Sequence, residues 1–319
     1  MSQNQYIPAE QPTMYFIGVT TGKSSIMKVF PAWAEYLKLD AVIKGFDFPP
    51  NDEAENYREV VQFIKNDPNS LGALVTTHKL NLYKACRDLF EGVGPYTKII
   101  DETSSISKRG SELWGHAKDP ITSGLSLEAI VDDGYWARTG AELLLLGAGG
   151  SSLALTLYLH NKLKDGGDVP SKIIVNNRSE KRLGEMKAVH KEIGLTIPIE
   201  YNLSPTAEGN DTRVTILKPG SMVVNATGLG KDRPGSPLTD AVEFPENGIA
   251  WEFNYRGDLI FLDQANAQKD KKNLTIEDGW VYFVHGWTRV IAEVFHIDIP
   301  TSGPEFDKLS EIAANISKK

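Results

Sequence analysis

The clearest chemical signal in the sequence is a glycine-rich loop that follows a run of leucines. Residues 143–146 lead directly into Gly147-Ala148-Gly149-Gly150-Ser151-Ser152, a G-x-G-x-x-S pattern. Gly147 permits a tight turn, Gly149 lets the backbone approach a pyrophosphate, and the small Ser152 lets helix and strand pack closely. Unpaired N–H groups at the helix start would bind phosphate. The pattern predicts a dinucleotide site at Gly147, Ala148, Gly149, Gly150 and Ser151. The alternative is a turn in which the glycines serve backbone geometry only.

The end of the next expected strand indicates which dinucleotide would bind. Here the chain reads Asn176-Asn177-Arg178-Ser179-Glu180-Lys181-Arg182, with no carboxylate at the strand end itself. An NAD site normally has an acid there to accept the ribose hydroxyls, whereas a 2′-phosphate needs cations and donors. Arg178 can pair with that phosphate or lie over the adenine, and Asn177, Ser179 and Arg182 supply further donors. We therefore expect NADP rather than NAD. The alternative is a solvated helix start, with Ser179 as its N-cap.

These motifs need a sheet to position them. Apolar runs alternate with segments of helical period, which is typical of the α/β class with a mostly parallel sheet. In the first part we expect strands at residues 15–19, 41–46 and 72–76 and helices at 25–37 and 53–65. In the second part we expect helices at residues 121–131, 152–163 and 181–193, a turn-rich piece at 132–140, and strands at 142–146, 172–175, 221–225 and 248–254. Residues 282–295 have helical spacing and are expected to pack back on the first part.

Length and composition limit the number of domains, the location and the class of partner. The chain has 319 residues, more than the about 250 to 300 at which single cores stop growing, so two domains are expected, with a boundary near residues 125–135. No apolar run approaches the roughly 20 residues that cross a bilayer, and the polar start lacks the pattern of a secretory signal, so we expect a cytoplasmic protein without membrane contact. A net charge of −8 argues against nucleic acid as partner and favours a small molecule. The sequence does not decide between a monomer and a homodimer.

The cysteine and histidine content excludes other chemistry. The single cysteine, Cys86, rules out an intramolecular disulfide and a cysteine-based zinc cluster, and it lies in a helical-looking stretch where a buried position is expected. The six histidines show no metal-ligand spacing such as H-x-x-x-H. We therefore expect no metal.

The order of motifs from residue 16 to residue 295 resembles the shikimate and quinate dehydrogenase family. The resemblance rests on strand-Gly-Lys-Ser, VTTHK, a polar G-x-x-x-D, LGAGG, NNRS, NATGLG and a late DG before an apolar segment. It implies a substrate-binding and catalytic domain at residues 1–125, with residues 286–319 packing back on it. It also implies a Rossmann-type NADP-binding domain with a parallel sheet at residues 126–285, and a cleft that holds substrate against the nicotinamide.

The resemblance assigns the proton-handling pair. The family's catalytic lysine falls on Lys79 and its aspartate on Asp119. Oxidising a secondary alcohol to a ketone removes the O–H proton as hydride leaves the carbon, so a base must contact that oxygen. Burial lowers the pKa of a lysine and an adjacent carboxylate raises it, so the two effects oppose each other. Without the family pattern, Lys79 would be read as a surface lysine and Asp119, before Pro120, as a turn residue.

The sequence departs from the family where the substrate is held. By the resemblance the substrate-binding residues are Ser24, Val75, Ser104, Tyr255, His285 and Gly286, and of the family's serine pair only Ser24 remains, because Ile26 occupies the second position. Val75, Ser104 and Gly286 replace a threonine, an asparagine and a glutamine. A site that hydrogen-bonds its substrate discriminates strongly between similar ligands, so losing several of these groups changes which ligand is accepted. We therefore expect a polyhydroxylated ring or sugar-derived substrate other than shikimate.

New polar and aromatic groups are candidates for lining the altered pocket. They are Lys23, Thr103, Ser105, His285 and Trp287, and for the last two a core position is the alternative. On the nicotinamide side the resemblance implies Asn225, Ala226, Thr227, Gly279 and Phe283.

Two other functional interpretations stay open. One keeps shikimate or quinate as substrate, with the missing donors replaced from Lys23, Ser104 or His285. The other is a non-catalytic NADP(H)-binding sensor, which needs only the segment from Gly147 to Arg182.

Overall fold

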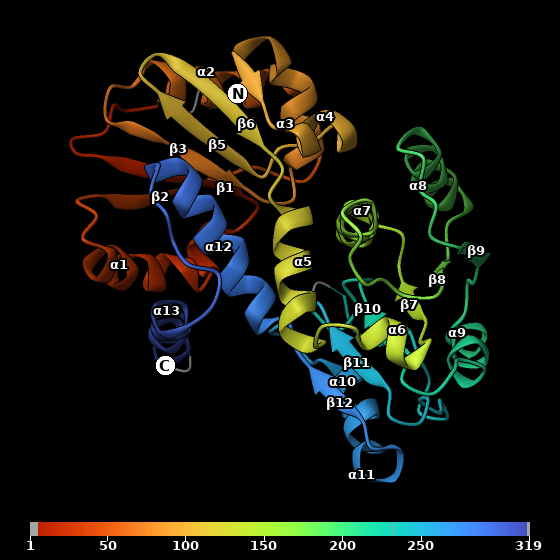
Figure 1. Cartoon of the computed structure of the whole chain (residues 1–319). Coiled ribbons are helices and arrows are strands. Elements are labelled where there is room, and N and C mark those ends of the chain that lie inside the picture. Colours follow the sequence, from red (N-terminus) through yellow and green to blue (C-terminus); the bar gives the residue numbers. More distant parts are fainter. Residues whose placement is uncertain (1–5, 232, 318–319) are drawn as a thin grey trace. The chain divides into compact units, whose positions relative to one another are not determined.

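The structure is a computed structural model that describes residues 6–231 and 233–317. It confirms the α/β class and contains two compact units. Unit 1 comprises Met1–Lys118 and Val284–Lys319, and unit 2 comprises Asp119–Phe283 (Figure 1). Helix α12 (Trp280–Phe295) begins in unit 2 and continues into unit 1.

Unit 1 is built on a six-stranded mixed sheet of order β2-β1-β3-β5-β6-β4. The strands are β1 (Thr13–Gly18), β2 (Val42–Asp47), β3 (Ser70–Val75), β4 (Gly92–Val93), β5 (Ser105–Arg109) and β6 (Glu112–His116). Strands β1, β2 and β3 run parallel, whereas β5 runs antiparallel to both of its neighbours. The helices are η1 (Thr21–Lys23), α1 (Ile26–Leu37), α2 (Ala54–Asn66), α3 (Lys79–Cys86), η2 (Arg87–Leu89), α4 (Pro95–Ile100) and α13 (Pro304–Ser317).

The alternating side chains of β1 and β3 supply a core on each face of the unit 1 sheet. Tyr15 and Ile17 pack with side chains of α2 and α3, including the buried Cys86. On the other face, the Phe16 ring meets the edge of Trp287 in α12. The indole N–H of Trp33 in α1 donates to the backbone oxygen of Leu309 in α13, at 2.8 Å. Both faces are therefore covered, as parallel strands require.

Unit 2 is a fully parallel six-stranded sheet of order β12-β11-β10-β7-β8-β9. Its strands are β7 (Leu143–Leu146), β8 (Ile173–Asn177), β9 (Ile199–Leu203), β10 (Met222–Asn225), β11 (Ile249–Glu252) and β12 (Thr275–Glu277). Its helices are α5 (Asp119–Ile130), α6 (Tyr135–Thr139), α7 (Gly150–Lys164), α8 (Glu180–Glu192), α9 (Ala207–Thr215), α10 (Ile260–Asn266) and α11 (Lys269–Lys272). The chain builds outward from β7 to β9 and then returns to the middle with β10, so the topological switch point lies between β7 and β10.

Strand β7 shows why this sequence forms a central strand. Leu143 and Leu145 join one buried cluster, and Leu144 and Leu146 join another on the opposite face. Because successive side chains of a strand point to opposite faces, four consecutive leucines fit only a strand that is covered on both sides. The sheet is thereby fixed in register directly before the glycine-rich loop.

Two expectations about secondary structure need correction. Residues 132–140 were expected to be turns, yet they include the short helix α6, flanked by Gly134 and Gly140 with positive φ. The sheet of unit 1 is also less parallel than expected, because β5 and β6 form a hairpin around Gly110. No helix in the described part of the chain is long and apolar enough to cross a membrane.

Candidate functional site

The glycine-rich loop connects the end of β7 to the start of α7. Gly147 has φ +110°, and a Cβ atom there would lie 2.8 Å from the backbone oxygen of Ala226. Glycine is therefore required at position 147, both by the positive φ and by the closeness of the Ala226 backbone. A Cβ at Gly149 would meet nothing within 4 Å, so the space beside it is open. The hydroxyl of the buried Ser152 donates to the backbone oxygen of Gly147 at 2.7 Å and ties the helix to the loop.

A pocket of about 590 Å³ opens at this loop, on the carboxyl edge of the unit 2 sheet. Ten of the residues that the sequence assigned to the cofactor line it: Gly147, Ala148, Gly149, Gly150, Asn177, Arg178, Ser179, Arg182, Ala226 and Thr227. The pocket lies beside the switch point between β7 and β10, where doubly wound sheets bind ligands. Its size suits a small-molecule cofactor.

Four residues assigned to the cofactor do not line this pocket. Ser151 is half-buried in α7, and Asn225 is fully buried behind Thr227. Gly279 lies directly before α12, where its N–H donates to the backbone oxygen of Asn254 at 3.0 Å. Phe283 packs against Tyr255, with ring centroids 4.5 Å apart.

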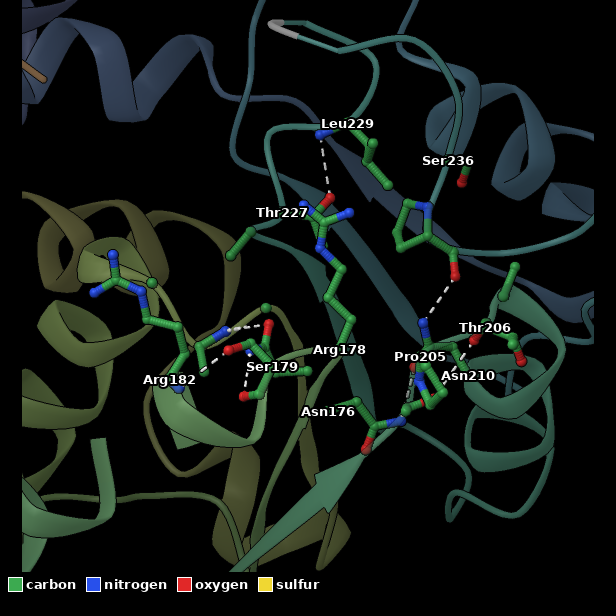
Figure 2. Close-up of a pocket in the computed structure, with 18 of the residues that line it drawn as sticks. Asn176, Arg178, Ser179, Arg182, Pro205, Thr206, Asn210, Thr227, Leu229 and Ser236 are labelled. Atoms are coloured by element: carbon green, nitrogen blue, oxygen red, sulfur yellow. Dashed lines mark hydrogen bonds between the residues drawn. The ribbon is translucent and has the colours of Figure 1, made fainter. Parts of the chain in front are cut away.

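The cations of the pocket differ in their existing partners. Arg182 already pairs with Glu185 on the same helix, at 2.9 Å. No carboxylate in residues 6–231 and 233–317 pairs with Arg178 or Arg233. Figure 2 shows Arg178 reaching from the end of β8 toward Thr227 and Leu229. Two exposed guanidinium groups are thus available to an anionic ligand.

Polar contacts hold the end of β8 against the glycine-rich loop. Asn177 Oδ1 accepts from the N–H of Ala148 at 3.4 Å, and its Nδ2 donates to the backbone oxygen of Ser179 at 3.0 Å. Ser179 is the N-cap of α8 and accepts from the N–H of Arg182. Ser179 therefore caps α8, as the alternative of a solvated helix start predicted, and it also lines the pocket.

Sequence reasoning missed ten further residues of the pocket wall: Asn176 lies in β8, and the others follow β9 or β10. These residues are Asn176, Ser204, Pro205, Thr206, Ala207, Asn210, Leu229, Arg233, Ser236 and Pro237. The sequence Ser204-Pro205-Thr206 could have indicated a helix start after β9, because threonine is a favoured N-cap residue. In the structure Thr206 is the N-cap of α9 and accepts from the N–H of Gly209 at 3.2 Å. Figure 2 shows this segment and Asn210, whose amide donates to the backbone oxygen of Pro237.

In unit 1, Lys79 is the first residue of α3, directly after a strained turn at the end of β3. Thr77 has φ +56°, an uncommon conformation for a β-branched residue. His78 is 1% exposed, and its Nδ1 lies 2.9 Å from the Tyr57 hydroxyl. The Lys79 backbone oxygen accepts from the N–H of Thr103 at 3.3 Å. Backbone strain of this kind concentrates at functional sites, where surrounding contacts hold it in place.

Asp119 begins α5 in unit 2, and the residues before it are anchored in unit 1. Glu293 on α12 lies 3.0 Å from His116 Nε2 and 2.7 Å from Lys118 Nζ. The contacts with His116 and Lys118 hold the pKa of Glu293 well below its usual range. This cluster, which the sequence did not predict, fixes the chain that leads to Asp119.

The remaining expected substrate residues lie in several environments. Ser24 is half-buried after η1, Val75 is buried in β3, and Ser104 Oγ accepts from the N–H of Lys118 at 2.7 Å. A Cβ at Gly286 would meet nothing within 4 Å. In unit 2, Tyr255 packs with Trp280 and Phe283.

His285 and Trp287 lie in the core of unit 1. The His285 ring stacks on Phe306 with centroids 4.4 Å apart, and burial lowers the pKa of His285 to about 4, with a smaller contribution from Arg289. Trp287 is buried against Phe16.

The other candidates for the altered pocket are divided between surface and core. Lys23 is exposed in η1, whereas Thr103 and Ser105 are fully buried, with the Thr103 hydroxyl donating to the backbone oxygen of Ser105. Among the described residues no group of three or more His, Cys, Asp or Glu side chains could hold a metal ion.

Comparison with known proteins gives matches at the level of structure only. No protein family model matches the chain, and no curated protein matches it. Shikimate dehydrogenase from Aquifex aeolicus superimposes with a TM-score of 0.71 at 18% identity, covering 98% of this chain and 100% of that one. A shikimate dehydrogenase solved with NADP+ gives 0.72 at 17% identity, with 97% of each chain covered. The ligand-free 5-ketofructose reductase of Gluconobacter sp. strain CHM43 gives 0.69 at 17% identity, covering 96% and 99%. The resemblance found in the motifs is thus confirmed for the architecture, and this chain has the fold of the shikimate dehydrogenases.

Proposed function

We propose that the protein is an NADP-dependent oxidoreductase that interconverts a secondary alcohol and a ketone on a small polyhydroxylated substrate. The observation that carries the proposal is the pocket at the switch point of the unit 2 sheet, lined by the glycine-rich loop and by Arg178 without a carboxylate partner among the described residues. The likeness to shikimate dehydrogenases and to a 5-ketofructose reductase supports the same reaction class.

The pocket residues fit NADP better than NAD. The pyrophosphate would lie on the N–H groups at the start of α7, where Gly149 leaves open space. Arg178, Ser179 and Arg233 would hold the 2′-phosphate, and the end of β8 offers the amides of Asn176 and Asn177 where an NAD site has an acid. When bound, the nicotinamide exchanges hydride with the substrate carbon.

Lys79 is proposed as the general acid and base, with Asp119 as its partner. In oxidation the Lys79 amine takes the hydroxyl proton, and in reduction it returns that proton to the carbonyl oxygen. The anchored turn at Thr77 and His78 supports this role, because a proton-transfer group must be held in a fixed position. Residues 1–125 with 286–319 would form the substrate domain, and residues 126–285 the NADP domain.

The substrate is proposed to be a polyhydroxylated ring or a sugar-derived ketone other than shikimate. Ser24, Ser104 and Tyr255 supply hydroxyl groups, and Val75, Gly286 and His285 complete the proposed set. The open space at Gly286 supports a substrate that extends where a longer side chain would stand. A cytoplasmic location remains a prediction from the sequence.

The test uses the purified full chain with NADP+ or NADPH and a panel of shikimate, quinate, cyclic polyols and keto sugars, followed by nicotinamide absorbance. We expect turnover of a polyol or keto sugar, with NADP(H) preferred over NAD(H). Lys79→Ala should lower kcat by about 100-fold or more while NADPH affinity is kept. NADPH binding without turnover of any compound would favour the sensor, and efficient turnover of shikimate would show that the substrate assignment is wrong.

A further inference from the structure

A fully buried carboxyl group lies behind the pocket, at the end of β11. Glu252 is 0% exposed and accepts three hydrogen bonds. Oε2 accepts from Asn225 Nδ2 at 2.5 Å, and Oε1 accepts from the Asn254 backbone N–H at 2.8 Å and from its Nδ2 at 2.6 Å. Buried glutamates are rare, and this one is neither in a salt bridge of the described residues nor part of the pocket wall.

One of its oxygens reaches the pocket through a directed chain of hydrogen bonds. Because Asn225 donates to Glu252 through Nδ2, its Oδ1 faces the other way and accepts from Thr227 N at 3.1 Å and Thr227 Oγ1 at 2.7 Å. Thr227 Oγ1 in turn accepts from the N–H of Leu229 at 3.2 Å. Figure 2 shows this last bond at the pocket wall. Asn225 Nδ2 also donates to the backbone oxygen of Leu229, at 3.4 Å. Glu252, through the shorter of the two bonds, and the Leu229 oxygen together orient the Asn225 amide, and that amide holds the 226–229 loop.

The other oxygen reaches the loop that precedes α12. Asn254, held at both nitrogens by Glu252, accepts from the N–H of Gly279 through its backbone oxygen. A Cβ at Gly279 would lie 2.3 Å from the backbone oxygen of Phe253, so this loop is packed tightly. The loops after β10, β11 and β12 thus converge on one carboxyl group. In a doubly wound sheet of this order, those three strands form the half that binds the nicotinamide end of a dinucleotide.

We propose that Glu252 is a positioning residue for the nicotinamide half of the cofactor site, acting through Asn225 on Thr227 and through Asn254 on Gly279. This inference rests on the proposed function, since it assumes that the pocket binds NADP(H). It adds that a residue outside the pocket wall acts mainly on one half of the cofactor, so that the adenosine half, at Arg178 and Ser179, is affected much less.

Protonation of Glu252 would oppose this arrangement. Burial raises the pKa of Glu252 to about 7, against the lowering effects of Asn254, Asn225 and the charge of Lys231. On the neighbouring strand β12, Glu277 pairs with Trp251, the residue before Glu252, and Asp278 follows directly after it. The ionised carboxylate can accept all three N–H donors. A proton on Oε2 would face Asn225 Nδ2, and reversing that amide would turn its donor toward Thr227 N.

The experiment compares NADPH with adenosine 2′,5′-bisphosphate, which has only the adenosine half. Dissociation constants for the full chain are measured by calorimetry at pH 8. Glu252→Gln places an amide donor opposite Asn225, so we expect NADPH affinity to fall at least about tenfold and the bisphosphate affinity to stay within about twofold. The double variant Asn225→Asp with Glu252→Gln restores a donor and an acceptor between positions 225 and 252 and keeps the acceptor for Thr227. Only the 3.4 Å bond to the Leu229 backbone oxygen is lost, so the double variant should recover most of the NADPH affinity.

A second measurement does not depend on how the variants fold. In the unmodified protein, the ratio of NADPH affinity to bisphosphate affinity should fall as pH drops from 8 to 6. The 2′-phosphate is common to both ligands and cancels, and protonation of the 5′-phosphate of the bisphosphate would change the ratio in the opposite direction. The Glu252→Gln variant, which has no ionisable group at this position, should not show this fall. Equal losses for both ligands in Glu252→Gln, no recovery in the double variant, or a flat ratio in the unmodified protein would overturn the inference. If the unmodified protein binds neither ligand, the proposed function fails and this inference with it.

Discussion

The Tyr57 hydroxyl lies 2.9 Å from Nδ1 of His78, the residue directly before Lys79. Burial lowers the pKa of His78, so its ring is neutral near pH 7 and Nδ1 can accept the hydroxyl proton. The same hydroxyl oxygen accepts from the N–H of Asp52 at 3.2 Å. Helix α2 thereby holds the strained turn at Thr77 from behind.

Tyr57→Phe is expected to loosen that turn. The change leaves His78 Nδ1 and the N–H of Asp52 without their partner, which should lower the free energy of unfolding by about 1 to 3 kcal/mol. It should lower kcat by about tenfold and leave NADPH affinity unchanged, because the cofactor pocket lies in unit 2. Urea unfolding and steady-state kinetics measure both. Tyr83→Phe, whose hydroxyl has no hydrogen bond to a described residue, is the matched control and should change neither quantity.

Arg178→Ala is expected to remove the preference for NADP. A lost guanidinium–phosphate pair costs about 1.5 to 3 kcal/mol, or roughly 10-fold to 150-fold in affinity. NADPH should bind more weakly by that factor, and NADH affinity should stay the same. Arg233→Ala should give a smaller loss, and Arg182→Ala the smallest, because Arg182 is already paired with Glu185. Arg138→Ala, in an ion pair with Asp132 away from the pocket, is the control. Equal losses for NADPH and NADH in Arg178→Ala would contradict the 2′-phosphate assignment.

Glu293→Gln is expected to destabilise the protein in a pH-dependent way. The pKa of Glu293 is lowered in the fold by His116 and Lys118, so its stabilising contribution is complete above the ordinary glutamate pKa and is lost as pH falls below it. At pH 7 the variant should lose about 2 kcal/mol of unfolding free energy, because Lys118 and Arg109 lose the carboxylate that they share and His116 loses its contact with it. The deficit should shrink between pH 5 and pH 3, as chemical unfolding across that range would show. Glu305→Gln, at an exposed position on α13, should show no such trend.

Gly286→Ala is expected to separate stability from catalysis. The glycine lies inside α12, and a Cβ there meets nothing within 4 Å, so alanine should stabilise the helix by roughly 0.5 to 1 kcal/mol. If substrate occupies this space, kcat/KM should nevertheless fall, and the larger Gly286→Gln should lower it further for the physiological substrate. Thermal unfolding measures the change in stability, and steady-state kinetics on the same preparations measure the change in kcat/KM. Unchanged kcat/KM in both variants would remove Gly286 from the proposed substrate set.

Strong local patterns made much of unit 2 predictable. Strand β7 and the start of α7 follow from four leucines and the glycine loop, and ten of the assigned cofactor residues line one pocket. The wall after β9 was missed despite the N-cap signal at Thr206, because β9 itself is half-exposed and polar, with Glu200 and Asn202 in its sequence. Its contribution depends on β9 lying beside β8, which is a property of the sheet.

Two other features were hidden for different physical reasons. The hairpin of β5 and β6 carries few apolar anchors, chiefly Ile106 and Leu113, so its alternation was weak. Glu252 was missed because a strand over residues 248–254 was expected, but a carboxylate in a strand is ordinarily assigned to its exposed side. The bonds that bury it come from Asn225 and Asn254, and the first of these is 27 residues away in the chain.

The division of the four β7 leucines between two separate clusters makes the segment intolerant of insertions and deletions. A shift of one residue in β7 would send each leucine to the opposite helix layer and move Gly147 off the only position in the loop whose backbone has a positive φ. Related sequences should therefore lack insertions and deletions between α6 and β7, even where side chains in the same region differ.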